Sequence, residues 1–406
     1  MNKQDIIEYF KQKVQQKGVM IEKDYISTGA TLADIITGGG YRSGSITNFI
    51  GNSEAGKTFM AVEAVYQAKK KYKNVNVRYN DAESGFTFDT EALYGFDIRE
   101  DMVKTPTIQE FAADFGSYAK KFKKNELGIY IVDSFDGLCS DDDIQEYEDR
   151  IKKYEEGKEY KQGSYDMSKQ KYSSKLFRTI CRDLDEFNVA LIIISQIRDN
   201  IGVTFGRNWT VSGGKALQFY SDNRLFLKSA ESFSVVGSDS VNREKGYCLE
   251  ITGIKTRSKW PHRKCYINLL FDYGVDNISS NIDYLYGLKD DKGKLDTGKC
   301  SSISWGENSG EVSDDEIKQF CMDNGWEEYA EKNEIKRYSR KRAMDFIKDN
   351  DALYNTFIDS FGVMDRDGLI AYIESNNLEK ELEEKTKQKW YTEEEKIASV
   401  RKRKTL

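Results

Sequence analysis

Residues 51–58 follow the pattern Gly-x4-Gly-Lys-Thr, in which small residues precede a lysine and a hydroxyl. Glycines let backbone amides turn inward around phosphate oxygens, and the start of a following helix adds the positive end of its dipole. In such a loop the lysine reaches the β- and γ-phosphates of a nucleotide, and the threonine hydroxyl binds Mg²⁺. The predicted nucleotide contacts are Gly51, Asn52, Ser53, Glu54, Ala55, Gly56, Lys57, Thr58 and Phe59.

The alternative interpretation of this loop is a glycine-rich turn that binds nothing. The flanking sequence favours the phosphate site, because the motif requires a strand before the loop and a helix after it. The apolar run SITNFIG precedes the loop, and the amphipathic segment KTFMAVEAVYQAKKKY follows it.

Carboxylates stand at two further strand ends. The run LGIYIVDS carries Asp133, which we predict to hold the magnesium. The run VNVRYNDAES carries Asp81 and Glu83, and alternation along a strand sends both to the same side. Solvated strand ends are the alternative. Ligands of open α/β sheets gather at the carboxyl ends of the strands, however, so the combination with the phosphate loop favours a site.

These residues need a sheet to bring them together. From about residue 25 to 275, short apolar runs alternate with helical patterns, which predicts an α/β fold with a mostly parallel central sheet covered on both faces. The last strands lack long helices between them and are expected to form an antiparallel extension. We predict three parts: an N-terminal helix for oligomerisation (1–24), an ATPase core (25–275) and a mostly helical C-terminal domain with a charged tail (276–406).

Composition excludes several classes of protein. The net charge of −6 argues against a globally basic protein that coats nucleic acid, although local basic patches are compatible with it. No segment approaches the roughly 18 apolar residues of a membrane span, and the N-terminus lacks the apolar centre of a signal peptide. The six cysteines form no CxxC pair, which favours reduced thiols in a cytoplasm. His262 is the only histidine, so a carboxylate is the expected general base.

Residues 139–172 interrupt the alternating pattern. They hold 10 acidic and 7 basic residues, which predicts a long, exposed and partly helical excursion.

Several blocks together resemble the RecA family of recombinases. They are the entry into the phosphate loop (STGATLADIITGGGYRSGSITNFIGNSEAGKT), the NDAES and IYIVDS blocks, and the stretch SQIRDNIGVTFG followed by SGGKALQFYSDNRL. The similarity extends over residues 27–275. The segment GIKTRSKWPHRKCYINLLFDYGVDNISSNIDYL is most similar to the phage branch of the family, which includes the T4-type strand-exchange recombinase.

The resemblance implies a DNA-dependent ATPase that uses ATP and Mg²⁺. It implies a helical filament on single-stranded DNA that pairs this strand with homologous duplex DNA, with ATP at the interfaces between subunits. Glu83 would activate water, Gln196 would sense the γ-phosphate, and the pair Lys255 and Arg257 would reach the nucleotide of the neighbouring subunit. Five Lys and Arg residues within residues 255–264 agree with this, although a solvated basic turn is the alternative.

The resemblance also places a DNA-binding loop after Gln196. Arginines would meet phosphates, glycines would admit backbone amides, and an aromatic ring would contact bases without a sequence code. For Phe205 the alternative is a core aromatic, which its glycine-rich setting disfavours. The predicted DNA-binding residues are Arg198, Gly202, Phe205, Gly206, Arg207, Gly213, Gly214 and Lys215.

The chain departs from the family at several positions. Ser195 and Lys215 replace asparagines, and Thr90 replaces the tyrosine that stacks on adenine, for which Phe88 or Tyr94 could substitute. The excursion at 139–172 lies where the first DNA loop is expected, and its acids would repel phosphate.

Three functions follow from these observations. The favoured one is an ATP-dependent recombinase in the cytoplasm, of a bacterial host if the protein is phage-encoded, with accessory loader or single-strand-binding proteins as further partners. A regulatory mediator that binds ATP without exchanging strands is the alternative. A helicase is disfavoured by the SGGKALQFY block.

Overall fold

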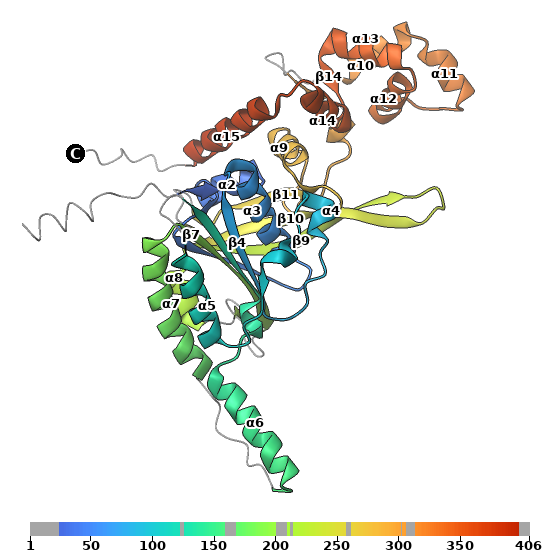
Figure 1. The fold of residues 1–406 in the computed structure, drawn as a ribbon. Coiled ribbons are helices and arrows are strands. Elements are labelled where there is room, and N and C mark those ends of the chain that lie inside the picture. The colour runs from blue at the N-terminus through green and yellow to red at the C-terminus, as the bar shows by residue number, and fades with distance from the viewer. Residues whose placement is uncertain are drawn as a thin grey trace, which may run out of the picture.

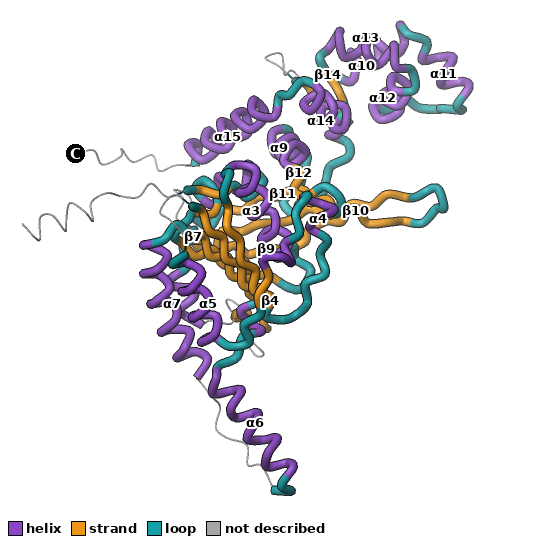
Figure 2. Tube along the Cα trace, viewed as in Figure 1, coloured by secondary structure: helices purple, strands orange, loops and turns teal. Residues whose placement is uncertain are grey.

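The computed structural model describes residues 24–121, 126–158, 168–199, 209–211, 214–256, 261–301, 303–305 and 313–397. These residues form one large sheet with helices on both faces and a group of helices beyond its edge (Figures 1 and 2). The predicted α/β fold is therefore confirmed. The N-terminal helix predicted for 1–24 lies outside the described residues, apart from Asp24 itself.

Ten strands of the described chain build the sheet. They are β3 (Ser45–Gly51), β4 (Val75–Asp81), β5 (Met102–Val103), β6 (Leu127–Asp133), β7 (Val189–Asp199), β8 (Trp209–Val211), β9 (Asn223–Val236), β10 (Asn242–Lys255), β11 (Lys264–Leu270) and β12 (Gly274–Asp276). Their order is β12-β11-β10-β9-β3-β7-β6-β4-β5, with β8 paired to β7. The strands from β9 to β5 in this order run parallel, and β10 to β12 form the expected antiparallel extension.

The parallel strands carry apolar side chains on both faces, so each strand contributes to two cores. On β6, Ile129 and Ile131 join the core beneath α2 and α3, whereas Tyr130 and Val132 join the core beneath α5, α7 and α8. These helices are α2 (Thr31–Thr37), α3 (Lys57–Lys71), α5 (Ile108–Ala119), α7 (Ser168–Glu186) and α8 (Gly214–Tyr220). The double burial fixes the carboxyl ends of the strands, where the predicted site lies.

Three strands extend further than their apolar sequences suggest. The apolar run of β7 ends at Ser195, but the strand continues to Asp199 because Ile197, Arg198 and Asp199 pair with β8. Strands β9 and β10 continue past the sheet as a hairpin arm, seen in yellow in Figure 1, with Val235 and Val236 exposed near its turn. These extensions contain polar residues, so the hydrophobic pattern of the sequence does not predict them.

The charged excursion is partly helical, as predicted. Helix α6 (Asp141–Glu155) begins with a capping box at Ser140 and Asp143 and buries none of its residues. It projects away from the sheet at the bottom of Figure 1. Residues 159–167 lie outside the described chain, and α7 begins at Ser168.

The helices after the sheet form two groups. The first, α10 to α13, encloses its own apolar cluster around Phe320, Trp326 and Phe357. The second, α9, α14 and α15, packs around Ile282 and Leu369, and Trp390 of α15 reaches the main core of the sheet. Their bounds are α9 (Asn277–Leu285), α10 (Asp314–Asp323), α11 (Trp326–Lys332), α12 (Arg340–Lys348), α13 (Asp351–Phe361), α14 (Arg366–Ser375) and α15 (Glu379–Lys396).

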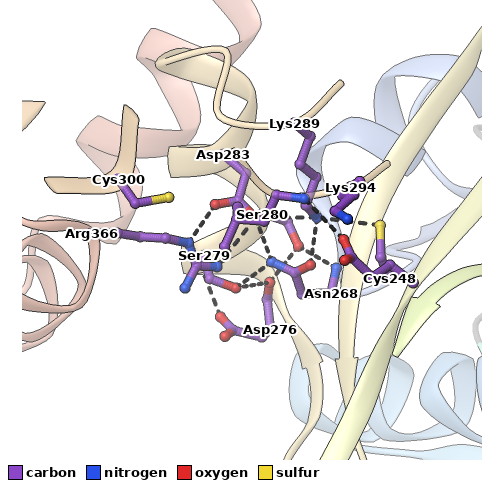
Figure 3. A network of polar contacts seen from close by, with 12 residues as sticks. Cys248, Asn268, Asp276, Ser279, Ser280, Asp283, Lys289, Lys294, Cys300 and Arg366 are labelled. Carbon is purple, nitrogen blue, oxygen red and sulfur yellow. Dashed lines mark hydrogen bonds and ion pairs between the residues drawn. The ribbon is translucent and has the colours of Figure 1, made fainter. Parts of the chain in front are cut away.

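A buried group of charges, which we call the junction cluster, joins these helices to the sheet (Figure 3). It consists of Asn268, Asp283, Lys289 and Arg366. Arg366 Nε donates to one Asp283 oxygen at 2.6 Å, and Lys289 Nζ lies 3.1 Å from the other. Asn268 Nδ2 donates to Asp283 at 2.8 Å. Two cations and an amide thus compensate one buried carboxylate.

The remaining elements of the described chain are short. They are β1 (Tyr25–Ile26), β2 (Tyr41–Arg42), α4 (Thr90–Tyr94), β13 (Ile303–Ser304) and β14 (Val363–Met364), with short 3-10 turns at Ile98–Asp101, Phe135–Gly137 and Lys299–Ser301. Across the described ranges, we find no helix with the length and apolarity needed to cross a membrane.

Candidate functional site

The phosphate loop joins β3 to α3 at the carboxyl edge of the sheet. Gly51 passes so close to β9 that a Cβ atom would lie 2.4 Å from the carbonyl oxygen of Leu227. Gly56 has φ 74°, a left-handed conformation that favours glycine, and α3 begins at the next residue. Asn52, Ser53 and Glu54 between these glycines are exposed. The loop therefore presents its backbone to solvent at the start of a helix.

Lys57 lies in the first turn of α3 and is largely buried. Its Nζ donates across the loop to the carbonyl oxygen of Asn52. Burial lowers the pKa of Lys57, and Asp133, Asp136 and Glu83 act in the opposite direction. This cation is thus surrounded by carboxylates from three other segments of the chain.

Thr58 and Asp133 come together from α3 and β6. Thr58 Oγ1 donates to Asp133 Oδ2 at 2.7 Å, and the hydroxyl of Tyr79 on β4 donates to the same oxygen at 2.6 Å. Burial raises the pKa of the Asp133 carboxyl. A hydroxyl and a carboxylate beside the lysine are the oxygen ligands that Mg²⁺ takes when nucleotide phosphates supply the rest. The residues present therefore suit a nucleotide-bound magnesium ion. The described residues contain no cluster of three or more ligands that would hold a metal by itself.

Glu83 lies in the turn that follows β4. The Ser134 hydroxyl donates to its carboxylate, and Gln196 Nε2 lies 3.3 Å from both carboxylate oxygens. The predicted base and the predicted sensor thus touch each other. The geometry inferred from strand alternation is wrong, because the strand ends at Asp81. Asp81 instead accepts backbone N–H groups within the same turn, from Gly85 and Phe86.

Asp136 is a site residue that sequence reasoning missed. Its side chain is only 7% exposed, and Oδ2 accepts the backbone N–H of Gln196 at 2.8 Å. Its Oδ1 lies 3.7 Å from the guanidinium of Arg198. The signal available in the sequence was its position three residues after Asp133 at the same strand end.

A cavity of about 880 Å³ opens outward from the phosphate loop. Beyond the loop residues, its lining includes Phe88, Phe226, Lys228, Tyr247 and Phe271. All the predicted nucleotide contacts except Gly51 line it, and Gly51 ends the strand that leads into it. A flat, aromatic wall next to a phosphate loop is suited to a nucleotide base.

The two aromatic substitutes for the adenine contact occupy different places. Phe88 lines the cavity, and its ring centroid is 5.2 Å from that of Phe59. Tyr94 donates its hydroxyl to Glu63 of α3 at 2.6 Å and is not among the lining residues. Thr90 is buried and accepts the backbone N–H of Ile98, so it supports the turn.

The predicted DNA-binding residues are described only in part. Arg198 lies near the end of β7, and its side chain is 64% exposed. Gly214 and Lys215 begin α8, and Lys215 is exposed. Trp209, where the chain returns in β8, stacks on Phe226 with ring centroids 5.2 Å apart. Gly202, Phe205, Gly206, Arg207 and Gly213 lie outside the described residues.

Lys255 lies at the far end of the sheet from the phosphate loop. It pairs with Arg224 near the start of β9, whereas the loop follows the carboxyl end of β3. Its Nζ donates to the carbonyl oxygens of Gln218 and Phe219 at the end of α8. Lys255 lines a separate cavity with Gly44 and Ile46 at the start of β3 and does not line the cavity at the phosphate loop. Arg257 lies outside the described residues.

Comparison with known proteins agrees with this geometry. The model of the RecA N-terminal domain matches residues 8–276, more than half of the chain. The protein RecA of Mesoplasma florum is 27% identical over 299 residues, which cover 73% of this chain and 83% of that protein. The protein RecA of Malacoplasma penetrans is 28% identical over 314 residues, covering 74% and 88%, and that of Aquifex pyrophilus is 28% identical over 265 residues, covering 65% and 70%. The match of a family model across most of the sheet, together with these relatives, shows that this chain belongs to the RecA family.

Proposed function

We propose that this protein is an ATP-dependent DNA recombinase that forms a helical filament on single-stranded DNA and promotes homologous pairing and strand exchange. The family supports recombination as the function. The observation that carries the proposal is the direct contact between Glu83, beside the phosphate loop, and Gln196, on the strand that leads into the predicted DNA loop. That contact joins a nucleotide site to a DNA site within one chain.

ATP hydrolysis follows from the residues at the carboxyl edge of the sheet. Lys57 neutralises phosphate charge, and the loop amides hold the phosphates. Thr58 and Asp133 hold the magnesium ion, which supplies electrostatic stabilisation of the transferred phosphoryl group. Glu83 orients and polarises the attacking water. Gln196 shares a hydrogen bond with Glu83, so a change at the nucleotide reaches β7.

Filament formation completes the site from a second subunit. Lys255 contacts the end of α8 and lines a cavity separate from that of its own phosphate loop, which supports a role at the nucleotide of the neighbouring subunit together with Arg257. Both cations would stabilise charge that develops on the γ-phosphate. The N-terminal helix (1–24) adds a further contact between subunits, the core (25–275) holds the ATPase site, and the C-terminal domain (276–406) follows the core.

DNA binds through the loop after β7 and the start of α8. Arg198, Arg207 and Lys215 contact phosphates, Gly202, Gly206, Gly213 and Gly214 admit the backbone, and Phe205 stacks on bases. The segment after Lys255 favours the phage branch of the family, and with it the cytoplasm of a bacterial host as the place of action. Accessory loader or single-strand-binding proteins are further partners.

A mediator that binds ATP and regulates a recombinase remains the second candidate. Helix α6 favours it, because Tyr147, Ile151 and Tyr154 are exposed on an otherwise acidic helix that would repel DNA.

Electron microscopy and a strand-exchange assay separate the two candidates. A recombinase forms regular filaments on single-stranded DNA with ATP and converts homologous duplex into joint molecules. A protein that binds ATP but forms neither filaments nor joint molecules, and instead changes the rate of another recombinase, is the mediator.

A further inference from the structure

Asp136 connects two segments of the chain that take part in the proposed function, the turn after β6 and strand β7. It lies in the short turn after β6, three residues beyond Asp133. One of its oxygens accepts the backbone N–H of Gln196 on β7. The other lies near the Arg198 guanidinium, two residues further along the same strand. The parallel pairing of β6 with β7 brings these groups together.

The two oxygens of Asp136 are held differently. Oδ2 makes a 2.8 Å hydrogen bond to a backbone amide, which fixes the position of Gln196. Oδ1 is buried and has no hydrogen-bond partner among the described residues, and the Arg198 cation 3.7 Å away compensates it by charge alone. Because the Arg198 side chain is 64% exposed, DNA phosphate can reach it and compete for this second contact.

Other cations also surround Asp136. Lys169, in the first turn of α7, donates to the backbone carbonyl of Asp136 at 3.1 Å, and its charge interacts with the Asp136 carboxylate. Lys57 of α3 interacts electrostatically with the same carboxylate. The carboxylate therefore stays compensated when Arg198 turns away, and Arg198 is the exposed cation of the group.

We propose that Asp136 is a positioning residue that couples DNA binding to the nucleotide site. It holds Gln196 against Glu83 through one oxygen, and it competes with DNA phosphate for Arg198 through the other. This inference rests on the proposed DNA-dependent ATPase. DNA phosphate takes Arg198 from Asp136. Because Arg198 and Gln196 lie on the same strand, this change displaces Gln196, the neighbour of Glu83.

Two substitutions separate the two roles. Asp136→Asn keeps an oxygen that accepts the Gln196 N–H but removes the charge that attracts Arg198. Arg198 then binds DNA without competition, and the DNA concentration that gives half-maximal ATPase stimulation falls about two- to fivefold, as for a partly exposed ion pair. Asp136→Ala also removes the acceptor, so the maximal stimulation itself falls.

The test measures ATP hydrolysis against the concentration of single-stranded oligonucleotide for the full chain. The matched control is Asp315→Asn, which removes one negative charge from the exposed first turn of α10. A double-mutant cycle with Arg198→Gln shows whether Asp136 acts through that arginine. The thermal midpoint of each variant is measured alongside, to show that the variant remains folded.

The expected result is a lower half-saturating DNA concentration for Asp136→Asn, no shift for Asp315→Asn, and no further shift when Asp136→Asn is added to Arg198→Gln. The proposal is overturned if Asp136→Asn leaves that concentration unchanged or raises it, if Asp315→Asn shifts it equally, or if the shift persists without Arg198. A wild-type ATPase that DNA does not stimulate would instead overturn the proposed function.

Discussion

Two groups of charges in this protein differ in how they are compensated. The junction cluster pairs one buried carboxylate, Asp283, with two cations and an amide. At the nucleotide edge, Glu83, Asp133 and Asp136 surround Lys57, while Arg198 reaches only Asp136. The first group is complete within the chain and fastens helices to the sheet. The second gathers three carboxylates beside Lys57, which suits a site that takes up a metal ion and a nucleotide.

The comparison predicts that replacing a carboxylate by an amide lowers catalysis in one group and the stability of the fold in the other. In the nucleotide group, Glu83→Gln removes the base that polarises water while keeping the shape of the side chain. We expect the kcat for ATP hydrolysis to fall by about 10²- to 10⁴-fold, with nucleotide affinity and thermal stability unchanged. Steady-state kinetics and titration with a fluorescent ATP analogue measure these quantities.

Asp81→Asn is the control for Glu83→Gln, because Asp81 only accepts hydrogen bonds within the turn. Hydrolysis by Glu83→Gln at the wild-type rate would show that another group acts as the base.

In the junction cluster, Asp283→Asn leaves Lys289 and Arg366 without their carboxylate. We expect this change to lower the free energy of unfolding by about 3–5 kcal/mol, the usual cost of breaking a buried pair. Urea denaturation measures it, with exposed Asp272→Asn as the control. A loss below about 1 kcal/mol would mean that the cluster does not fasten the helices to the sheet.

The same cluster predicts a pH dependence. Burial raises the pKa of the Asp283 carboxyl, but the opposite effect of Arg366 and Lys289 is larger. The pKa of Asp283 therefore lies below its ordinary value. Its stabilising effect is therefore fully present above the ordinary aspartate pKa of about 3.9 and is lost as the pH falls through the lowered value. Below that range, wild type and Asp283→Asn should converge in urea denaturation. A difference between them that persists unchanged in strong acid would contradict this account.

Smaller effects are expected for residues that hold the carboxylates of the nucleotide group in place through hydrogen bonds. Tyr79→Phe removes one of two hydroxyl donors to Asp133 Oδ2. We expect the Mg²⁺ concentration for half-maximal hydrolysis to rise about tenfold, because such supporting bonds orient a metal ligand. Tyr130→Phe, whose hydroxyl donates to Asp114 instead, is the matched control. An unchanged magnesium requirement would remove Tyr79 from the site.

The smallest effect is expected on α6, which belongs to neither group. Ile151→Lys should change the free energy of unfolding by less than about 0.5 kcal/mol, since the helix buries none of its residues. A larger loss in urea denaturation would mean that α6 packs against the rest of the protein.

The difference between the two groups of charges also explains which features could be predicted from the sequence. Strand β3 matches its apolar run residue for residue, and the position of the phosphate loop followed from a local motif. The contact between Thr58 and Asp133 followed from the rule that ligands gather at strand ends. Each of these signals lies within one short segment or one general rule of sheet topology.

The remaining features depend on spatial neighbours that are distant in sequence. Asp136 acquires its role from the pairing of β6 with β7, and Arg366 meets Asp283 across 83 positions of the chain. The extension of β7 to Asp199 depends on pairing with β8, which apolar pattern does not reveal. Without tertiary structure, each of these residues is simply a polar side chain at a strand end or on a helix.

The rate of ATP hydrolysis with and without single-stranded DNA tests the central claim most directly. Contact between Glu83 and Gln196 predicts that saturating DNA raises kcat while the KM for ATP changes little. Gln196→Glu, which keeps the size of the side chain and places a carboxylate beside Glu83, should abolish the stimulation. A hydrolysis rate that is the same with and without DNA would contradict the account.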